Sequence, residues 1–272
     1  MGNFNPMKKL LFLLLAIALI GNSCKKGCID ENAINFDPDA KRDAENCLYE
    51  SPIVNLNFIF RFGGEELSFD NYYTDVNGNQ VAVEIFRFYI SDVNLVKPSG
   101  ETYQLAEAEL VDFDLLDTAW SNSFSYKIPL EDFSQLTFGV GLNSSINAID
   151  PALYESSSPL SIYPGMYWTW ATKYIFSKFE GKLIPNGQTN PTGIFYHTGL
   201  DKYYAEVQPI SINLKEEFGE VNNLNFIIDM EKIFSEGSTP INYVTETNTH
   251  TMDNEPLAEK FLINLRSAIT LE

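Results

Sequence analysis

Histidine is nearly absent from this chain, which has two histidines among 272 residues. A metal site built from three histidines is therefore excluded. The familiar catalytic motifs are missing as well, because the sequence contains no Gly-x-Ser-x-Gly elbow, no His-Glu-x-x-His segment and no phosphate-binding loop. The 37 acidic residues contain many pairs, but nothing in the pattern singles out one pair for glycoside hydrolysis. We therefore expect a binding protein and not an enzyme.

Basic residues are also scarce, with 18 Lys and Arg against 37 Asp and Glu and a formal net charge of −19. Removal of residues 1–23 would leave 16 basic residues and a formal charge of −21. A surface of this sign repels nucleic acid and anionic lipid. The composition thus excludes a nucleic-acid partner.

Long hydrophobic runs are limited to one segment, from Leu10 to Ile20. It is too short to cross a bilayer, which needs about 20 residues. Lys8 and Lys9 stand directly before it, and a charged start followed by a short apolar run is typical of a secretory signal. Residues 1–23 are therefore predicted to be a signal peptide.

The residues that follow resemble the end of a bacterial lipoprotein signal. Small residues lead into a cysteine in Gly21-Asn22-Ser23-Cys24, and the resemblance implies cleavage before Cys24 and a lipid on its sulfur. Lys25 and Lys26 stand where an acidic residue would suggest retention in the inner membrane. We expect an outer-membrane lipoprotein, held to lipid through Cys24 and facing the periplasm or the cell surface. Simple secretion is the alternative.

Two further cysteines, Cys28 and Cys47, form an even pair in an oxidising compartment and predict a disulfide. In the chain-entropy model this closure stabilises the loop by about 3 kcal/mol. Residues 24–51 then form an acidic tether. Oxygen ligands that suit Ca²⁺ occur in it, although their spacing is not that of an EF-hand, and a tether without an ion is the alternative. These residues are Asp30, Asn32, Asn35, Asp37 and Asp39.

Residues 52–272 contain no linker and are predicted to be one domain. Apolar residues alternate with polar ones from Val54 to Phe62 and again from Phe86 to Ile90, which is the period of a half-buried strand. Asn77-Gly78 is a turn signal. The further predicted strands are 103–113, 124–129, 135–142, 166–179, 194–197, 204–214 and 224–230.

Many short strands with frequent turns and 14% aromatic residues are typical of an antiparallel β-sandwich. One helix is expected near the C-terminus, because Asn254 to Pro256 is a helix start and apolar residues recur at helical spacing after it. The apolar positions are Leu257, Phe261, Leu262, Leu265 and Ile269. The prediction is thus an all-β fold with a C-terminal helix that covers one edge or end of the sandwich.

Two of the three tryptophans, Trp168 and Trp170, fall in the predicted strand 166–179. At positions i and i+2 of a strand their side chains point to the same face. Core packing is the ordinary role of such residues. A histidine follows nearby in Tyr196-His197-Thr198-Gly199, so metal chemistry is also available here.

Several segments follow one another in an order that is typical of one known family. They are Phe88–Val93, Phe138–Asn143, Gly165–Trp170 with Tyr174, Phe176, Glu180 and Gly181, Tyr196–Gly199, Asp229–Phe234, and His250–Met252 with Asn264. In this order they resemble the MbnP-like family of periplasmic copper-binding proteins. The resemblance spans residues 53 to 270, and its most specific parts are the Trp-x-Trp and His-x-Gly segments. Lys173 departs from the pattern, which tends to have glycine there.

The resemblance implies a β-rich copper-binding domain in which a partner di-haem peroxidase oxidises one tryptophan to kynurenine. Indole N–H is a donor only, whereas opening of the ring exposes an aromatic amine that can bind a metal. Imidazole suits copper, and a thioether suits Cu(I). Carried onto this chain, the resemblance implies ligands from His197 and His250, an oxidisable Trp168 or Trp170, and Met252 as a further candidate.

A second function remains open from the residues alone, which is a surface-anchored module that binds glycan or protein without a metal. Tyrosine and tryptophan on a rigid sandwich supply flat stacking surfaces for sugars. The candidates are Tyr72, Tyr73, Tyr167, Tyr203 and Tyr204. The two functions differ in geometry, because copper needs both histidines and a tryptophan to converge, whereas glycan binding needs exposed coplanar rings.

Overall fold

A computed structural model of the chain describes residues 25–68, 71–114, 122–169, 172–234 and 239–272. These residues form two compact units, one of residues 25–52 with Glu217–Glu220 and one of Ile53–Glu216 with Val221–Glu272. The predicted signal peptide, Cys24 and Trp170 lie outside the described residues. Within the described parts, no helix is long and apolar enough to cross a membrane.

The smaller unit confirms the predicted disulfide between Cys28 and Cys47, whose Cα atoms are 4.9 Å apart. Its only regular structure in the described residues is a parallel pair of short strands, β1 (Lys26–Gly27) and β2 (Arg42–Asp43). Cys28 is buried, so the cross-link lies in the centre of a unit that has few other apolar side chains.

The acidic oxygens of this unit are engaged in local contacts. Asp30 accepts hydrogen bonds from the backbone and side-chain nitrogens of Asn32 and from the hydroxyl of Tyr49. Asp37 accepts from Lys25 Nζ at 2.9 Å. Turns of this kind hold a short polar segment together through its own side chains. The predicted Ca²⁺ site in the tether stays a prediction.

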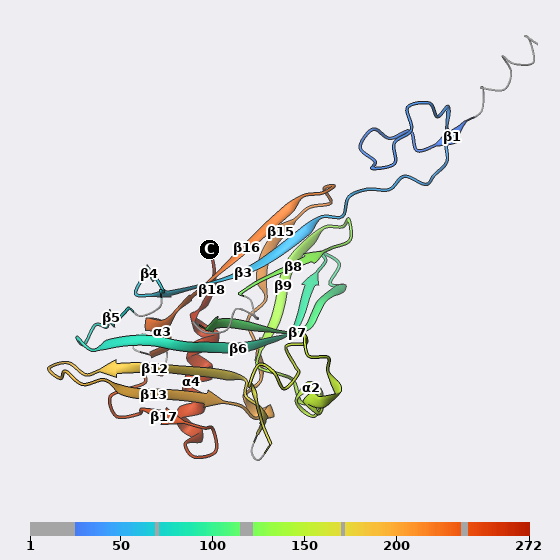
Figure 1. Cartoon of the computed structure of the whole chain (residues 1–272). Helices are drawn as coiled ribbons and strands as arrows, with labels where there is room; N and C mark the ends of the chain where they lie inside the picture. Colours follow the sequence, from blue (N-terminus) through green and yellow to red (C-terminus); the bar gives the residue numbers. More distant parts are fainter. Residues whose placement is uncertain (1–24, 69–70, 115–121, 170–171, 235–238) are drawn as a thin grey trace, which may run out of the picture. The chain divides into compact units, whose positions relative to one another are not determined.

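The larger unit contains two large sheets and a two-stranded hairpin (Figure 1). In the nine-stranded sheet the order is β14-β9-β6-β12-β13-β17, with β15 on β9 and with β5 and β7 on β6. Its strands are β5 (Tyr73–Thr74), β6 (Gln80–Val96), β7 (Thr102–Asp114), β9 (Phe133–Val140), β12 (Ser177–Ile184), β13 (Thr192–Thr198), β14 (Ala205–Glu206), β15 (Ile210–Leu214) and β17 (Asn248–Thr249).

The five-stranded sheet has the order β18-β16-β3-β4, with β8 on β3. Its strands are β3 (Ile53–Phe62), β4 (Glu65–Glu66), β8 (Ser123–Lys127), β16 (Val221–Asp229) and β18 (Ile269–Leu271). The helices of the unit are α2 (Ser144–Asn147), α3 (Met230–Phe234) and α4 (Glu255–Ala268), with 3₁₀ turns η1 (Pro151–Leu153) and η2 (Asp201–Tyr203).

The core lies between the inner faces of the two sheets. Every second residue of β3 is buried, as its alternating pattern predicts. Phe58 of β3 packs against Phe88 of β6 at 6.2 Å and against Phe226 of β16 at 5.2 Å between ring centroids. The all-β sandwich is therefore confirmed, with the alternation in β3 as its clearest signal.

Helix α4 belongs to the same layer as the five-stranded sheet. Its Phe261 packs on the inner face of the nine-stranded sheet, against Phe86, Phe179 and Tyr196. The predicted apolar stripe is buried from Leu257 to Leu265. The helix thus covers the part of the large sheet that carries β12 and β13 (Figure 1).

Three predictions about strands were wrong in detail. The predicted strand 166–179 is a short antiparallel hairpin, β10 (Tyr167–Trp168) with β11 (Lys173–Tyr174), followed by the start of β12. The predicted strand 204–214 is divided into β14 and β15, because Pro209 between them cannot donate a hydrogen bond to a ladder. The sandwich is not wholly antiparallel, since β3–β16 and β13–β17 are parallel pairs.

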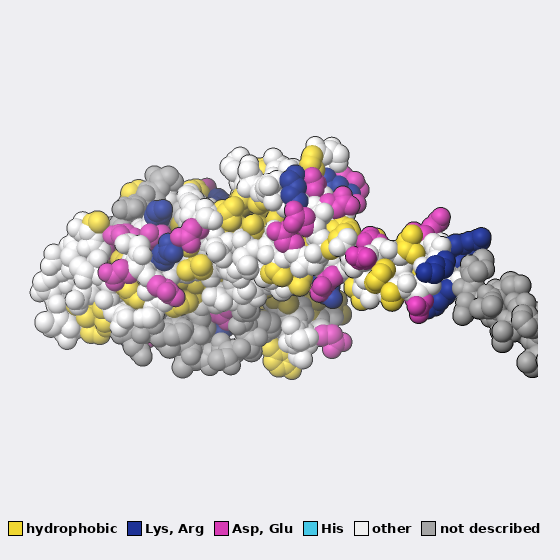
Figure 2. Space-filling model, turned by 90° about the horizontal axis from the view of Figure 1, so that it is seen from above, with side chains coloured by type: hydrophobic (Ala, Val, Ile, Leu, Met, Phe, Trp, Pro, Cys, Tyr) yellow, Lys and Arg dark blue, Asp and Glu magenta, His cyan; other side chains and the backbone are white. Residues whose placement is uncertain are grey.

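The acidic excess is spread over the surface and mixed with cations. Figure 2 shows Asp and Glu side chains next to Lys and Arg at several places on one face. Lys97 contacts Glu101 and Glu131, each at 2.9 Å, and Lys215 contacts Asp132 at 3.0 Å. Exposed pairs of this kind are each worth about 0–1 kcal/mol. The surface charge therefore favours solubility more than stability.

Candidate metal centre

His197 lies on β13, on the face of the large sheet that points away from the core. Its neighbour Tyr196 is fully buried on the inner face, and side chains alternate along a strand. Across the ladder His197 stands opposite Lys178 of β12. Only 12% of the His197 side chain is exposed, so residues outside the sheet cover it.

His250 is brought to His197 by the parallel pairing of β17 with β13. Tyr196 is in register with Thr249, and the residue that follows each of them in the chain is a histidine. Thr251 reinforces this register, because its hydroxyl donates to the His197 carbonyl at 3.0 Å. The two imidazole centroids are 5.1 Å apart with their planes nearly perpendicular. The structure therefore places the two imidazole rings side by side, and a shared copper site at this place stays a prediction.

Trp168 completes the cluster from the β10–β11 hairpin. Its ring lies 6.2 Å from that of His197 and 6.4 Å from that of His250, between centroids. The hairpin approaches β13 closely because Gly199 has no side chain. A Cβ at this position would stand 2.6 Å from the carbonyl oxygen of Tyr174 and from Thr172 Oγ1. This contact is a physical reason for the glycine in the His-x-Gly segment.

Asn147 is a second link between the hairpin and the end of β13. Its side-chain oxygen accepts from the Tyr174 backbone N–H at 3.1 Å, and its amide donates to Asp201 at 2.6 Å. The residue is buried at the end of the short helix α2. One asparagine near a helix end carries no periodic signal, so the sequence alone does not predict the role of Asn147.

Two carboxylates that the sequence analysis did not assign to the site contact the histidines. Glu180 Oε1 lies 3.0 Å from His197 Nε2 and also 3.2 Å from Lys178 Nζ. Asp253 Oδ2 lies 3.2 Å from His250 Nδ1. Asp253 follows His250 by three residues in the sequence, and this short spacing could have indicated a contact between the two side chains. Glu180 is among the residues that carry the family resemblance, but the resemblance assigns it no role.

The surroundings keep His197 uncharged at neutral pH. Burial lowers the pKa of His197 to about 4, the nearby charges of Lys178 and His250 act in the same direction, and Glu180 opposes them. A metal binds the neutral form of imidazole. The His197 side chain is therefore in the form that binds a metal over the physiological pH range.

The donor set fits a metal that accepts few ligands and favours imidazole. Within the described parts of the chain, no three side chains of the His, Cys, Asp or Glu type are grouped so as to hold a metal ion. Two imidazoles remain, and Cu(I) accepts such ligands. The unmodified indole of Trp168 adds no donor. Met252 is 63% exposed, and Trp170 lies outside the described residues.

The tyrosines considered for glycan stacking are in part buried. Tyr73 and Tyr203 are each 7% exposed. Tyr167 packs edge-on against Tyr174, with 5.1 Å between the ring centroids. Tyr204 donates its hydroxyl to Asp92 at 2.6 Å. Of the candidates, only Tyr72 is an exposed ring.

The fold and the site together define a β-sandwich protein with a histidine pair and a tryptophan on the outer face of its larger sheet. The chain belongs to the MbnP family, because the family model described as MbnP matches residues 51–253. Among solved structures, MbnP from Methylosinus trichosporium is similar, with 15% identity, a TM-score of 0.48, and coverage of 68% of this chain and 78% of that one. A comparison with curated proteins found no match.

Proposed function

We propose that this protein binds one copper ion between His197 and His250, beside Trp168, and stores or relays the ion in the cell envelope. The observation that carries the proposal is the 5.1 Å separation of the two imidazole centroids. These are the only two histidines of the chain, and they come from segments 53 residues apart in the sequence. The family resemblance supports the same metal.

His197 supplies a neutral, largely buried donor. His197 is shielded from solvent and uncharged, so it can bind Cu(I) without first losing a proton. A di-haem peroxidase, as the resemblance implies, would supply the oxidising equivalents that open the indole ring of Trp168. The aromatic amine of the resulting kynurenine would be the third donor. A site of this kind has no open position for a reacting substrate, so the proposal is binding and not catalysis.

The first test is metal analysis of the purified protein beside the variants His197→Ala and His250→Ala. We expect one copper ion per chain in the wild type and loss of copper in both variants. Phe195→Ala is a matched control, because Phe195 lies two residues before His197 on the same face of β13 and is also partly exposed. Wild-type protein that takes up no copper after loading would contradict the proposal.

Peptide mass spectrometry tests the modification separately. Conversion of tryptophan to kynurenine inserts two oxygen atoms into the indole ring, and hydrolysis by one water molecule then releases the formyl carbon as formic acid. The residue thus exchanges one carbon for one oxygen, a net gain of ~4 Da. We expect this gain on the peptide that contains Trp168 when the protein is made together with its peroxidase. A Trp168→Phe variant should show no such gain on that peptide. An unmodified Trp168 in copper-loaded protein would restrict the site to the two histidines.

The anchor at Cys24 is part of the same proposal and has its own test. The lipoprotein signal predicts that wild-type protein incorporates a labelled fatty acid and sediments with outer membranes. A Cys24→Ala variant should lose the label and appear in the soluble fraction. Label that persists in the variant would exclude this anchor without affecting the copper site.

A further inference from the structure

Each histidine of the copper site has one ring nitrogen held by a carboxylate. His197 Nε2 is 3.0 Å from Glu180 Oε1, and His250 Nδ1 is 3.2 Å from Asp253 Oδ2. An ionised carboxylate only accepts hydrogen bonds. In the neutral rings the protons must therefore be on Nε2 of His197 and on Nδ1 of His250.

Each carboxylate is itself oriented by a second donor. Lys178 Nζ is 3.2 Å from the same oxygen of Glu180 that faces His197. Lys178 and Glu180 are two residues apart on β12, so both side chains are on the face that carries His197. Asp253 accepts the backbone N–H of His250 at 2.7 Å through its other oxygen. Both carboxylates are thus fixed before a metal arrives.

The opposite ring nitrogens remain as lone-pair donors. In the described part of the chain, Nδ1 of His197 and Nε2 of His250 have no hydrogen-bond partner. The hydrogen bond at one imidazole nitrogen decides which nitrogen can bind a metal. For His250 this selects the Nδ1-protonated ring, which is the less common tautomer of histidine in water. The selection is therefore a property of the fold and not of the free side chain.

We propose that Glu180 and Asp253 are positioning residues that present copper with two different ring nitrogens, Nδ1 of His197 and Nε2 of His250. The inference rests on the copper site proposed above. Carboxylate–histidine–metal arrangements fix the tautomer and ring orientation, and their disruption lowers metal affinity by about 10- to 100-fold. Glu180 and Asp253 do not touch the metal, so their effect is transmitted through the imidazoles.

The tautomers can be read directly in the copper-free protein. Labelling with ¹⁵N-histidine gives four ring-nitrogen signals, because the chain has two histidines. The His197→Ala spectrum assigns them. In the uncharged rings we expect a protonated Nε2 and an unprotonated Nδ1 for His197, and the reverse for His250. On addition of Cu(I), the two unprotonated nitrogens should shift most.

The variants Glu180→Gln and Asp253→Asn test the role of the carboxylates. An amide can donate as well as accept, so it no longer dictates which nitrogen carries the proton. We expect mixed tautomers and a fall in Cu(I) affinity of about 10- to 100-fold in competition with a coloured Cu(I) chelator. Glu84→Gln and Asp132→Asn are matched controls, because these carboxylates pair with Lys182 and Lys215 instead of histidine.

The outcomes separate this inference from the proposed function. Wild-type protein that binds copper with the opposite ring nitrogens, or variants with wild-type tautomers and affinity, would overturn the role of the carboxylates and leave the copper site standing. Wild-type protein that binds no copper would overturn the proposed function itself. Thermal unfolding of each variant shows whether it is folded. The Glu180→Asp variant keeps a carboxylate, so its His197 should have the wild-type tautomer, in contrast to Glu180→Gln.

Discussion

Lys173 has a backbone φ of 68°, in the left-handed region where a side chain is disfavoured. It stands opposite Trp168 in the β10–β11 hairpin, and its side chain is exposed. Glycine reaches positive φ without strain, so the backbone conformation agrees with the glycine that the family resemblance implies at this position. Lys173 is therefore an energetic cost of about 1 kcal/mol in this chain.

A Lys173→Gly substitution should stabilise the protein by about 0.5–1 kcal/mol, because relief of strain exceeds the entropy that glycine adds to the unfolded chain. In thermal unfolding this corresponds to a rise in Tm of about 2 °C for a domain of this size. Lys182→Gly, at an exposed position of β12 with ordinary backbone angles, should instead destabilise. An equal loss of stability in Lys173→Gly and Lys182→Gly would show that the backbone of Lys173 is not strained.

At the scale of elements, the approach of the β10–β11 hairpin to β13 creates the site. We expect Gly199→Ala to destabilise the protein by about 1–3 kcal/mol, because the new methyl group meets the Tyr174 carbonyl oxygen, which is backbone and cannot move away alone. In protein whose Trp168 has been converted to kynurenine, the proposed copper affinity should also fall, because this third donor moves with the hairpin. Gly193→Ala on the same strand is the control, since its nearest neighbour is the movable side chain of Phe195. Unfolding curves and copper titration check both.

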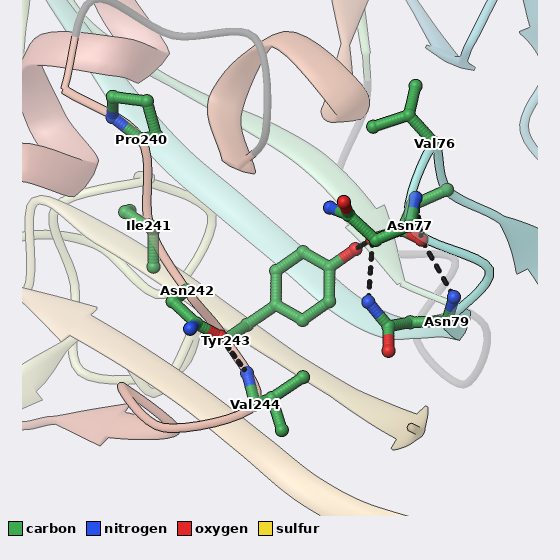
Figure 3. A pocket seen from close by; sticks show the side chains of 9 residues that line it. Val76, Asn77, Asn79, Pro240, Ile241, Asn242, Tyr243 and Val244 are labelled. Carbon is green, nitrogen blue, oxygen red and sulfur yellow. Dashed lines mark hydrogen bonds between the residues drawn. The ribbon is translucent and has the colours of Figure 1, made fainter. Parts of the chain in front are cut away.

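A second junction joins the turn before β6 to the segment that leads to β17. A cavity of about 590 Å³ lies there. It is lined on one side by Asp75, Val76, Asn77 and Asn79 and on the other by Pro240–Val244. The ring of Tyr243 extends across it toward the turn (Figure 3), and its hydroxyl donates to Asp75. Asp75 also accepts from the backbone N–H groups of Asn77 and Asn79. Tyr243 thus ties the His250 segment to the large sheet.

Acid should weaken this junction. Burial alone would raise the pKa of Asp75, but the hydrogen bonds from Tyr243 and Asn79 outweigh it and hold that pKa below its ordinary value. A carboxyl group whose pKa is lower in the folded state than in the unfolded state stabilises the protein at pH values above the unfolded-state pKa. This stabilisation is lost as the pH falls through the folded-state pKa. We expect Tyr243→Phe to cost about 1.5–3 kcal/mol at pH 7 and less below about pH 4.

Denaturant titrations at pH 7 and pH 3 provide the measurement. Tyr196→Phe is the control, because the Tyr196 hydroxyl donates to the backbone carbonyl of Glu246 and not to a carboxylate. The loss of unfolding free energy caused by Tyr196→Phe should be as large at pH 3 as at pH 7. A Tyr243→Phe cost that is the same at both pH values would show that the charge of Asp75 does not contribute.

At the scale of the whole molecule, the two units should respond separately to reduction. Replacing Cys28 and Cys47 with serine should remove about 3 kcal/mol of stability from the smaller unit, whose loop is closed by that bond. Limited proteolysis should then cleave within residues 25–52, while the thermal transition and copper content of the larger unit stay at wild-type values. A fall in the transition temperature and the copper content of the larger unit would show that this unit depends on the disulfide.

The sequence predicted the elements whose signals are local. The period of two in β3, the Asn77-Gly78 turn and the apolar stripe of α4 each depend on neighbours within a few residues. The strand predicted from Phe86 to Ile90 lies in β6, but it is buried on both faces and not half-buried, because Arg87 and Tyr89 are covered as well. The hairpin at Trp168 was not predicted, because aromatic residues throughout 166–179 imitate a strand. Its fold depends on Asn147 and Gly199, which reach it from other segments.

The sequence by itself determined the all-β class, the disulfide and the scarcity of metal-binding side chains, because composition and short-range periodicity are properties of the chain alone. Only the tertiary structure decided that His197, His250 and Trp168 meet, since a parallel strand pair and a glycine contact join three separate segments. The contacts of Glu180 and Asp253 with the two histidines likewise depend on the tertiary structure. Side-chain pairs across strands follow from register, and register is set when the whole sheet assembles.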